Sequence, residues 1–203
     1  IVDDVHKMPG AKWFSGAQIN FAENLLRFRD DRIAIHFQLE NFPSKTITYN
    51  ELYNQVRALA HSLRSIGIQK GDRVVGYLPN IPETVVAMLA TTSIGAIWSS
   101  CSPDFGIKGV LDRFKQIEPK IVFSADGYIY NGKSFDSLEK LKTIISQIPA
   151  VQKVVLVDYI NQNQNQIVIP NSIKYTDFLS HSPDPIKFEQ LPFNHPVYIM
   201  YSS

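Results

Sequence analysis

The sequence contains one cysteine, Cys101, in 203 residues. A single thiol excludes an internal disulfide and is typical of proteins in a reducing compartment. No histidine is near Cys101 in the sequence, so we interpret it as a small buried residue rather than a nucleophile. The five histidines are scattered, without the spacing of a metal site. We therefore expect no disulfide and no metal centre built from histidine and cysteine.

An excess of charge of one sign is also missing, because the formal net charge is +1 and no basic block occurs. Such a balance gives no long-range attraction to nucleic acid or to an anionic membrane. Residues 84–103 are uncharged over about the length that spans a bilayer, yet serine, threonine and Gly95 interrupt the run. We interpret it as a buried helix followed by a buried strand. Because Ile1–Gly10 is polar and acidic, unlike a signal peptide, we expect a cytoplasmic location.

Several catalytic motifs are absent as well. The sequence has no G-x-S-x-G nucleophile elbow and no H-E-x-x-H zinc motif. No G-x-G-x-x-G follows a strand-like run, which weakens a nicotinamide-dependent oxidoreductase. We also expect no phosphate-binding loop of the P-loop type. From spacing alone, the chain is an α/β protein with an unassigned ligand face.

The informative stretch is 71–123, where short apolar runs alternate with amphipathic ones. Proline and glycine residues, including Pro82 and Gly95, mark where the helical patterns begin and end. The pattern predicts three buried strands separated by two helices, with strands at Arg73–Leu78, Ala96–Ser99 and Lys120–Phe123 and a second helix at Gly106–Ile117. Short links between them predict a layered, mostly parallel sheet flanked by helices. Ligands of such sheets bind beyond the carboxyl ends of the strands.

Outside this stretch the patterns extend the same architecture. Thr48 and Glu51 form a capping box that opens a helix ending at Gly67. Further predicted elements are a hairpin from Ile33–Phe37 and Lys45–Thr48, a loop or short hairpin over 124–133, a helix from about 138, a strand at Lys153–Val157, an amide-rich loop at 161–166 and a strand at Val197–Tyr201. We divide the chain into an aromatic, partly helical arm (1–32) and an α/β unit (33–203). Because it stops after a strand-like run, we expect a piece of a longer protein, incomplete at its C-terminal end.

Specific residues carry a resemblance to a known family. Thr48-Tyr49, Gly71–Val74 and Pro79–Glu83 are similar to the conserved steps of AMP-forming acyl-CoA synthetases, in the adenylate-forming superfamily. The stretch Trp98–Gly106 (WSSCSPDFG) resembles the acetoacetate-activating branch of that family more narrowly. The resemblance covers nearly the whole chain. It implies the N-terminal portion of a nucleotide-binding α/β domain.

The resemblance implies a two-step reaction with ATP, Mg²⁺ and CoA. Acetoacetate and ATP would form acetoacetyl-AMP and diphosphate, and the CoA thiol would then displace AMP. In the family, Tyr-Ser-Ser continues into a Gly/Thr-rich loop around the ATP phosphates, so Ser202 and Ser203 are implied phosphate contacts. The adenine-binding segments and the catalytic lysine of the family have no counterpart in these residues, so the chain alone is expected to be inactive.

The family also implies a site for CoA. In acetyl-CoA-forming relatives, a basic loop after the third strand contacts the CoA 3′-phosphate, and Tyr130, Asn131, Gly132 and Lys133 fall near that place. The relatives carry arginine where this chain has Tyr130, so an ordinary solvated loop remains the alternative. The turn containing Asp104 is a second candidate CoA contact, while Asp104 could equally cap the helical run beginning at Phe105.

Other functions remain open at this stage. Most residues lining the acyl pocket would lie beyond Ser203, so another short acid is an alternative to acetoacetate. A non-catalytic α/β module that binds a nucleotide or a protein partner is a rival of a different class. Small-molecule substrates are the expected partners, without nucleic acid or membrane.

Overall fold

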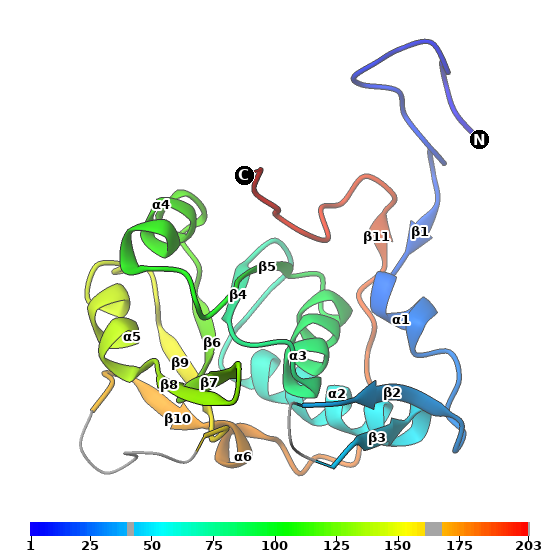
Figure 1. The fold of residues 1–203 in the computed structure, drawn as a ribbon. Helices are drawn as coiled ribbons and strands as arrows, with labels where there is room; N and C mark the ends of the chain where they lie inside the picture. Colours follow the sequence, from blue (N-terminus) through cyan, green and yellow to red (C-terminus); the bar gives the residue numbers. More distant parts are fainter. Residues whose placement is uncertain (40–42, 161–167, 203) are drawn as a thin grey trace.

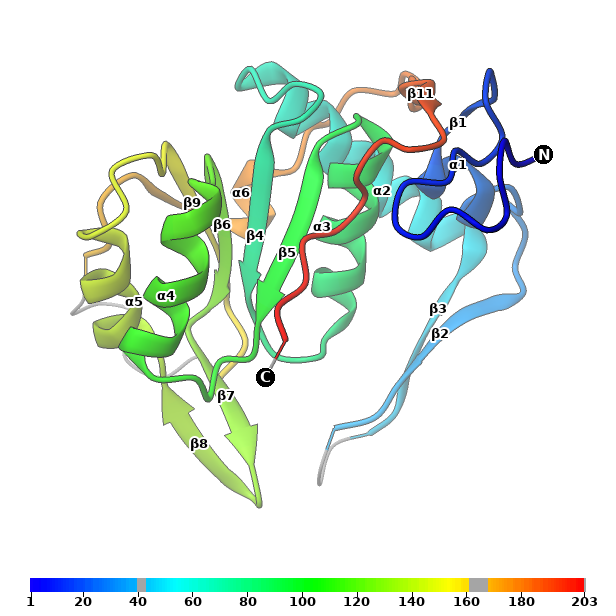
Figure 2. The same ribbon diagram turned by 90° about the horizontal axis from the view of Figure 1, so that it is seen from above.

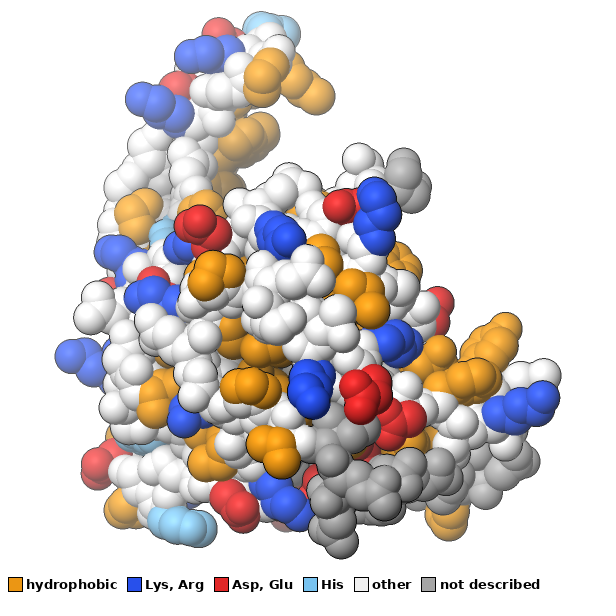
Figure 3. Space-filling view, turned by 90° about the vertical axis from the view of Figure 1, so that its left-hand side faces the viewer, with side chains coloured by type: hydrophobic (Ala, Val, Ile, Leu, Met, Phe, Trp, Pro, Cys, Tyr) orange, Lys and Arg blue, Asp and Glu red, His pale blue; other side chains and the backbone are white. Residues whose placement is uncertain are grey.

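The computed structural model describes residues 1–39, 43–160 and 168–202 (Figure 1). The predicted amide-rich loop at 161–166 and the predicted phosphate contact Ser203 lie outside these residues. No helix within the described ranges is both long and apolar enough to cross a bilayer. Viewed from the side of helices α4 (Ile107–Ile117) and α5 (Leu138–Ile145), the surface shows acidic and basic side chains interspersed (Figure 3).

A five-stranded parallel sheet forms the centre of the molecule. Its order is β10 (Ser172–Lys174), β9 (Lys153–Val157), β6 (Ile121–Ala125), β4 (Arg73–Tyr77) and β5 (Ile97–Cys101). β4, the first strand of the predicted unit, pairs in parallel with both β5 and β6. The predicted α/β fold with a mostly parallel sheet is therefore confirmed.

Helices cover both faces of this sheet. α2 (Tyr49–Ser65) and α3 (Pro82–Ser93) lie on one face, and α4 and α5 lie on the other (Figures 1 and 2). Neighbouring strand residues point to opposite faces, so Val74 belongs to the core under α2 and α3 while Val75 belongs to the core under α4 and α5. Strands buried on both faces read as continuous apolar runs, which is the pattern in the sequence.

Local signals account for the helix ends. The Thr48 hydroxyl accepts from the Glu51 backbone N–H at 3.2 Å, and the Glu51 carboxylate accepts from the Thr48 N–H at 2.8 Å. The predicted capping box is therefore present at the start of α2. Pro82 occupies the first turn of α3, and Gly95 follows its end with a φ of +77°, a conformation that favours glycine.

Smaller elements surround the sheet. The predicted hairpin forms from β2 (Ile33–Phe37) and β3 (Lys45–Thr48), and the 124–133 region forms a hairpin from β7 (Gly127–Tyr130) and β8 (Lys133–Asp136). The remaining elements are α1 (Phe21–Leu25), α6 (Tyr175–Phe178) and an antiparallel pair of β1 (Gln18–Ile19) with β11 (Leu191–Pro192). The β1–β11 pair was not predicted, because it joins two very short segments from opposite ends of the chain.

Helix α2 also holds the connector that follows α6. Arg57 and Arg64 donate to main-chain carbonyls of this connector at 3.1 and 2.7 Å, and the His61 ring lies 2.8 Å from a third carbonyl. These acceptors all belong to residues 183–187. The irregular, proline-containing segment is thereby tied along the outside of α2.

The predicted strand at Val197–Tyr201 is largely wrong. The segment runs beside β5, yet only one parallel bridge forms, between Trp98 and Tyr198. Trp98 donates to Val197 and accepts from Ile199, at 3.0 and 2.9 Å. The Ser99 hydroxyl then donates to the Ile199 carbonyl at 2.8 Å, so a side chain takes the place of the next backbone bond. The segment is extended and lies at the β5 edge of the sheet.

Candidate functional site

Three connections gather beyond the carboxyl ends of β4, β5 and β6. Parallel strands end at the same edge of a sheet, and ligands of such sheets bind there. The connections are the loop before α3, the turn Ser102–Gly106 after β5, and the β7–β8 hairpin after β6. Figure 2 shows the hairpin and the C-terminal end of the chain at the same end of the molecule. We consider this edge the candidate site.

Buried side chains hold the turn Ser102–Gly106 in place. The Tyr77 hydroxyl lies 2.9 Å from the carbonyl oxygens of both Pro103 and Phe105, and these two acceptors share its single hydrogen. Tyr77 is 1% exposed, and this burial, with smaller contributions from nearby acidic groups, raises its pKa to about 12. The hydroxyl therefore stays protonated, and remains a donor, at neutral pH.

Asp104 lies at the exposed part of this turn. Helix α4 begins at Ile107 with Gly106 at its N-cap position, and no side chain caps it. The alternative role of Asp104, as a cap for a helix beginning at Phe105, is therefore wrong. A helix starting at Ile107 leaves Asp104 two positions before the N-cap residue Gly106.

The β7–β8 hairpin presents the residues proposed from sequence to contact CoA. Tyr130 pairs with Lys133, and Asn131 and Gly132 between them both have positive φ, at 49° and 70°. Two consecutive positive φ values indicate a type I′ turn, for which Asn-Gly is the preferred sequence. Tyr130 is 68% exposed, and Lys133 is exposed as well. The tip of the hairpin is therefore accessible to a ligand.

Residues Gly127–Ser134 match the spacing G-x-x-x-x-G-K-S, a match that our sequence interpretation passed over. A P-loop needs this spacing between a strand and the start of a helix, where its backbone N–H groups surround phosphate. Here Gly127 lies on strand β7 of an antiparallel hairpin and Gly132 lies in its turn, with no helix following. This match to the P-loop spacing is therefore not a P-loop, because it forms a hairpin instead of a strand, loop and helix.

A groove of about 520 Å³ lies between the end of β5, α4 and the C-terminal segment. It is lined by Met88, Trp98, Ser99, Ser100, Cys101, Ser102, Phe105, Arg113, Tyr198, Ile199, Met200 and Tyr201. The Arg113 guanidinium lies 4.9 Å from the centroid of the Phe105 ring and 5.6 Å from that of Tyr201. The Tyr201 hydroxyl donates to the Arg113 carbonyl at 2.8 Å. Arg113 thus places a positive charge beside the residue that precedes Ser202.

Sequence analysis missed Arg113. It lies next to Phe114, a fully buried residue of the same amphipathic helix, and α4 carries other basic residues that are exposed. The only sequence signal for Arg113 was its position at the border of the apolar face of this helix. Many arginines that simply face solvent have the same position, so the signal did not indicate a functional role. Ser202 is exposed at the end of the described chain.

Cys101 lines the same groove without being reactive. It is 5% exposed, and burial raises the pKa of its thiol to about 11. Nucleophilic cysteines are thiolates with lowered pKa values, so this thiol stays neutral at physiological pH. The sequence interpretation of Cys101 as a small buried residue is confirmed.

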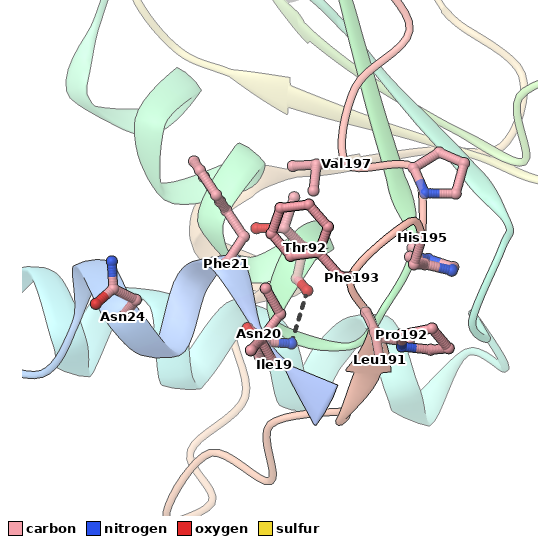
Figure 4. Close-up of a pocket in the computed structure, with 12 residues that line it drawn as sticks. Ile19, Asn20, Phe21, Asn24, Thr92, Leu191, Pro192, Phe193, His195 and Val197 are labelled. Atoms are coloured by element: carbon pink, nitrogen blue, oxygen red, sulfur yellow. Dashed lines mark hydrogen bonds between the residues drawn. The ribbon is translucent and has the colours of Figure 1, made fainter. Parts of the chain in front are cut away.

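A second cavity, of about 440 Å³, lies away from this edge. It is enclosed by α1, the end of α3 and the segment around β11, near the start of β5 (Figure 4). The Asn20 side-chain amide donates to the Thr92 and Ser93 carbonyls at 3.1 Å and to the Glu189 carbonyl at 2.9 Å. This side chain therefore joins the arm, α3 and the β11 segment, and its polar atoms are used in holding the fold together.

Comparison with known proteins identifies the family. The profile of the AMP-binding enzyme family matches residues 21–203. The chain belongs to the AMP-binding enzyme family. The match begins within the arm that we assigned to residues 1–32, so the family resemblance includes α1.

Relatives within the AMP-binding family are named for CoA-thioester formation. The acetoacetyl-CoA synthetase of Mus musculus is 48% identical over 200 residues, which are 95% of this chain and 30% of that protein. The acetoacetyl-coenzyme A synthetase of Rhizobium meliloti is 44% identical over 98% of this chain and 31% of its own length. The malonamoyl-CoA synthetase of Penicillium aethiopicum is 38% identical over the whole chain and 30% of its own length.

A solved structure shows the same fold. The acetoacetyl-CoA synthetase from Streptomyces lividans superimposes with a TM-score of 0.89 and 40% identity, covering 96% of this chain and 30% of that one. The chain therefore spans about three-tenths of the length of the relatives it matches. The resemblance of its sequence to AMP-forming acyl-CoA synthetases is confirmed.

Proposed function

We propose that the complete protein containing this chain is an AMP-forming acetoacetate–CoA ligase. The observation that supports this most is the 48% identity, across 95% of the chain, to the acetoacetyl-CoA synthetase of Mus musculus. The Streptomyces lividans structure, with the same name, supports it through the fold. We further propose that this chain by itself is inactive, because it spans about 30% of those proteins.

The proposed chemistry has two steps. A carboxylate oxygen of acetoacetate attacks the α-phosphorus of ATP and diphosphate leaves, which gives acetoacetyl-AMP. The CoA thiolate then attacks the acyl carbon and AMP leaves, which gives acetoacetyl-CoA. Both steps depend on holding anionic reactants in line and offsetting their charge, rather than on a covalent enzyme intermediate.

For the first step, we propose that Ser202 and Ser203 contribute hydroxyl groups to the ATP phosphates. Arg113 supports this position, because its guanidinium lies against the ring of Tyr201, directly before Ser202. A guanidinium is always charged and suits phosphate oxygens. The described residues contain no cluster of three or more potential metal ligands, so we propose that Mg²⁺ enters bound to the ATP phosphates.

For the second step, we propose that CoA contacts the hairpin tip Tyr130–Lys133 and the turn containing Asp104. Both are exposed and both lie beyond the carboxyl ends of the strands. Lys133 would supply the positive charge for the CoA 3′-phosphate, with the Asn131–Gly132 turn setting its direction.

Since the lone cysteine suggests a reducing compartment, we propose a cytoplasmic location for the protein.

An isotope-exchange assay tests the adenylation step. The complete gene product is expected to catalyse acetoacetate-dependent exchange between ATP and diphosphate without CoA, because exchange requires only the first step. The chain of residues 1–203 alone is expected to show none. Absence of exchange by the complete protein would favour a non-catalytic binding module.

The same assay distinguishes acetoacetate from other acids. The 38% identity to a malonamoyl-CoA synthetase is a specific reason to include malonamate, whose amide nitrogen replaces the methyl group of acetoacetate. Acetate and propionate complete the series. Higher kcat/KM for malonamate, acetate or propionate than for acetoacetate would retain the ligase and replace its substrate.

Removing the charge of Lys133 is expected to weaken CoA binding selectively. In the complete protein, Lys133→Ala should raise the KM for CoA about tenfold, the equivalent of ~1.4 kcal/mol. The exchange reaction should keep its wild-type rate, because CoA takes no part in it. Steady-state kinetics with each substrate varied in turn measures both quantities.

Lys142→Ala is the matched control for this variant. Lys142 is an exposed lysine on α5, away from the hairpin tip, so its replacement should leave the KM for CoA unchanged. Dephospho-CoA, which lacks the 3′-phosphate, provides a second check. If Lys133 binds that phosphate, Lys133→Ala should leave the KM for dephospho-CoA unchanged. Equal losses with CoA and dephospho-CoA would remove this role from Lys133.

A further inference from the structure

One lysine contacts both of the exposed elements at the carboxyl edge. Lys140 lies on α5, and its ammonium donates to the Pro103 carbonyl, in the turn Ser102–Gly106, at 3.1 Å. The same ammonium lies 5.4 Å from the centroid of the Tyr128 ring, on strand β7 of the hairpin. Lys140 therefore joins the turn to the hairpin through a hydrogen bond on one side and a cation–π contact on the other.

Each end of this connection is itself held firmly. On the turn side, the buried Tyr77 hydroxyl donates to the Pro103 and Phe105 carbonyls, so the Pro103 carbonyl has two side-chain donors. On the hairpin side, the Tyr128 ring stacks on that of Phe135, with centroids 5.0 Å apart and an interplanar angle of 14°. The stacked rings belong to a cross-strand pair of residues, close in sequence to the Asn131–Gly132 turn. A displacement of Lys140 would therefore change contacts in both the turn Ser102–Gly106 and the β7–β8 hairpin.

The contacts reach across three elements that are otherwise separate in the sequence. Tyr77 ends β4, the turn follows β5, and Lys140 belongs to α5, which is anchored in the core by the buried Leu141 and Ile144. Lys140 is half-buried and its hydrogen bond to Pro103 is partly buried, so this contact is less screened by water than one made by an exposed lysine. The adenylation step proposed above assigns no part to these side chains.

We propose that Lys140 and Tyr77 are positioning residues that set the spacing between the turn Ser102–Gly106 and the hairpin tip Tyr130–Lys133, and so determine the affinity for CoA. This rests on the proposed function, in which CoA lies against both elements. Neither side chain touches a reacting atom. A ligand that bridges two elements binds best when their separation is preset, because less ordering is needed on binding.

The test uses the complete protein and variants that preserve packing. Lys140→Met keeps the apolar stem and removes the charge and the donor. The KM for CoA is expected to rise about threefold to tenfold. The KM values for ATP and acetoacetate, and the rate of ATP–diphosphate exchange, should stay within about twofold of wild type. Lys140→Arg keeps a charged donor, so it should restore part of the lost affinity. Tyr77→Phe should act in the same direction as Lys140→Met.

Two controls separate positioning from general stability. Lys142→Met makes the same replacement two residues along α5, at an exposed site, and should change nothing. Tyr53→Phe removes another buried tyrosine hydroxyl, which accepts from the Ile186 N–H at 3.2 Å far from the turn. It should lower the melting temperature as Tyr77→Phe does, without altering the KM for CoA. Should Tyr77→Phe fail to fold, the three lysine variants still decide the proposal.

A second readout does not depend on activity. Hydrogen exchange followed by mass spectrometry should show faster amide exchange in peptides covering 102–106 and 127–136 of Lys140→Met, and no change elsewhere. Unchanged exchange in the hairpin peptide, or a KM for CoA equal to wild type, would overturn the positioning role. A wild-type protein without ATP–diphosphate exchange would instead overturn the ligase, and the hydrogen-exchange result would still judge the connection between turn and hairpin.

Discussion

Replacing Phe114 with alanine is expected to lower the free energy of unfolding by about 3–5 kcal/mol. Phe114 is fully buried on α4, in the core that α4 and α5 form against the sheet. The same core contains Val75 and Val122 from the strands and Leu141 from α5. Truncation removes the ring from all of these neighbours at once and leaves a cavity that the rigid sheet cannot fill.

Urea unfolding followed by circular dichroism measures this loss. Because domains are stable by only about 5–15 kcal/mol, the variant should unfold at a much lower urea concentration. Phe193→Ala is the control, since Phe193 is 40% exposed and its ring centroid lies 4.8 Å from that of Phe14, outside the α4–α5 core. Equal destabilisation by the two substitutions would show that the α4–α5 core is not the stabilising layer that its burial indicates.

Gly127→Ala is expected to disrupt the β7–β8 hairpin. A Cβ at this position would overlap the backbone carbonyl oxygen of Phe135 and the side chain of Ile160. The carbonyl belongs to the paired strand and cannot rotate away, so the strands must separate. Overpacking of this kind destabilises by about 1–3 kcal/mol, and more where backbone must move.

Gly127→Ala should affect the use of CoA more than it affects the free energy of unfolding. If CoA binds at the hairpin tip as proposed, Gly127→Ala should raise the KM for CoA at least about tenfold, with ATP–diphosphate exchange retained. The control is Gly109→Ala, in the first turn of α4, where a Cβ meets only ordinary contacts at 3.8 Å. Alanine there should leave the helix at least as stable, because it restricts the unfolded chain more than glycine does. A Gly127→Ala protein with wild-type use of CoA would exclude the hairpin from the CoA site.

The candidate site was predicted from sequence only in outline. The stretch 71–123 predicted parallel strands, and parallel strands bring their following loops to one edge, which is where the turn and the hairpin lie. Asn131-Gly132 was in the predicted loop or hairpin, and its positive φ values follow from the preference of these residues. The partners of these loops were not predictable. Nothing in the sequence near Tyr77 or Lys140 indicates that both donate to Pro103.

Errors came where a pattern was local but its partner was distant. Val197–Tyr201 is as apolar as a strand, yet the Ser99 hydroxyl takes the acceptor that a backbone N–H would have used. Asp104 precedes a helix as a cap would, yet α4 begins at Ile107, two residues after the start at Phe105 that such a cap requires. In both cases the composition was compatible with two conformations, and packing against β5 or β4 selected one.

The sequence by itself determined the elements and the family. The helix ends at Thr48, Pro82 and Gly95 depend on residues within about four positions of one another, as do the apolar runs of β4 and β6. Such local patterns can be recognised from the sequence without knowledge of the fold. Only the tertiary structure placed Arg113 beside Tyr201, joined Lys140 to both exposed loops, and buried the Asn20 amide among three carbonyls. Those contacts join residues far apart in the chain, and their geometry exists only once both faces of the sheet are packed.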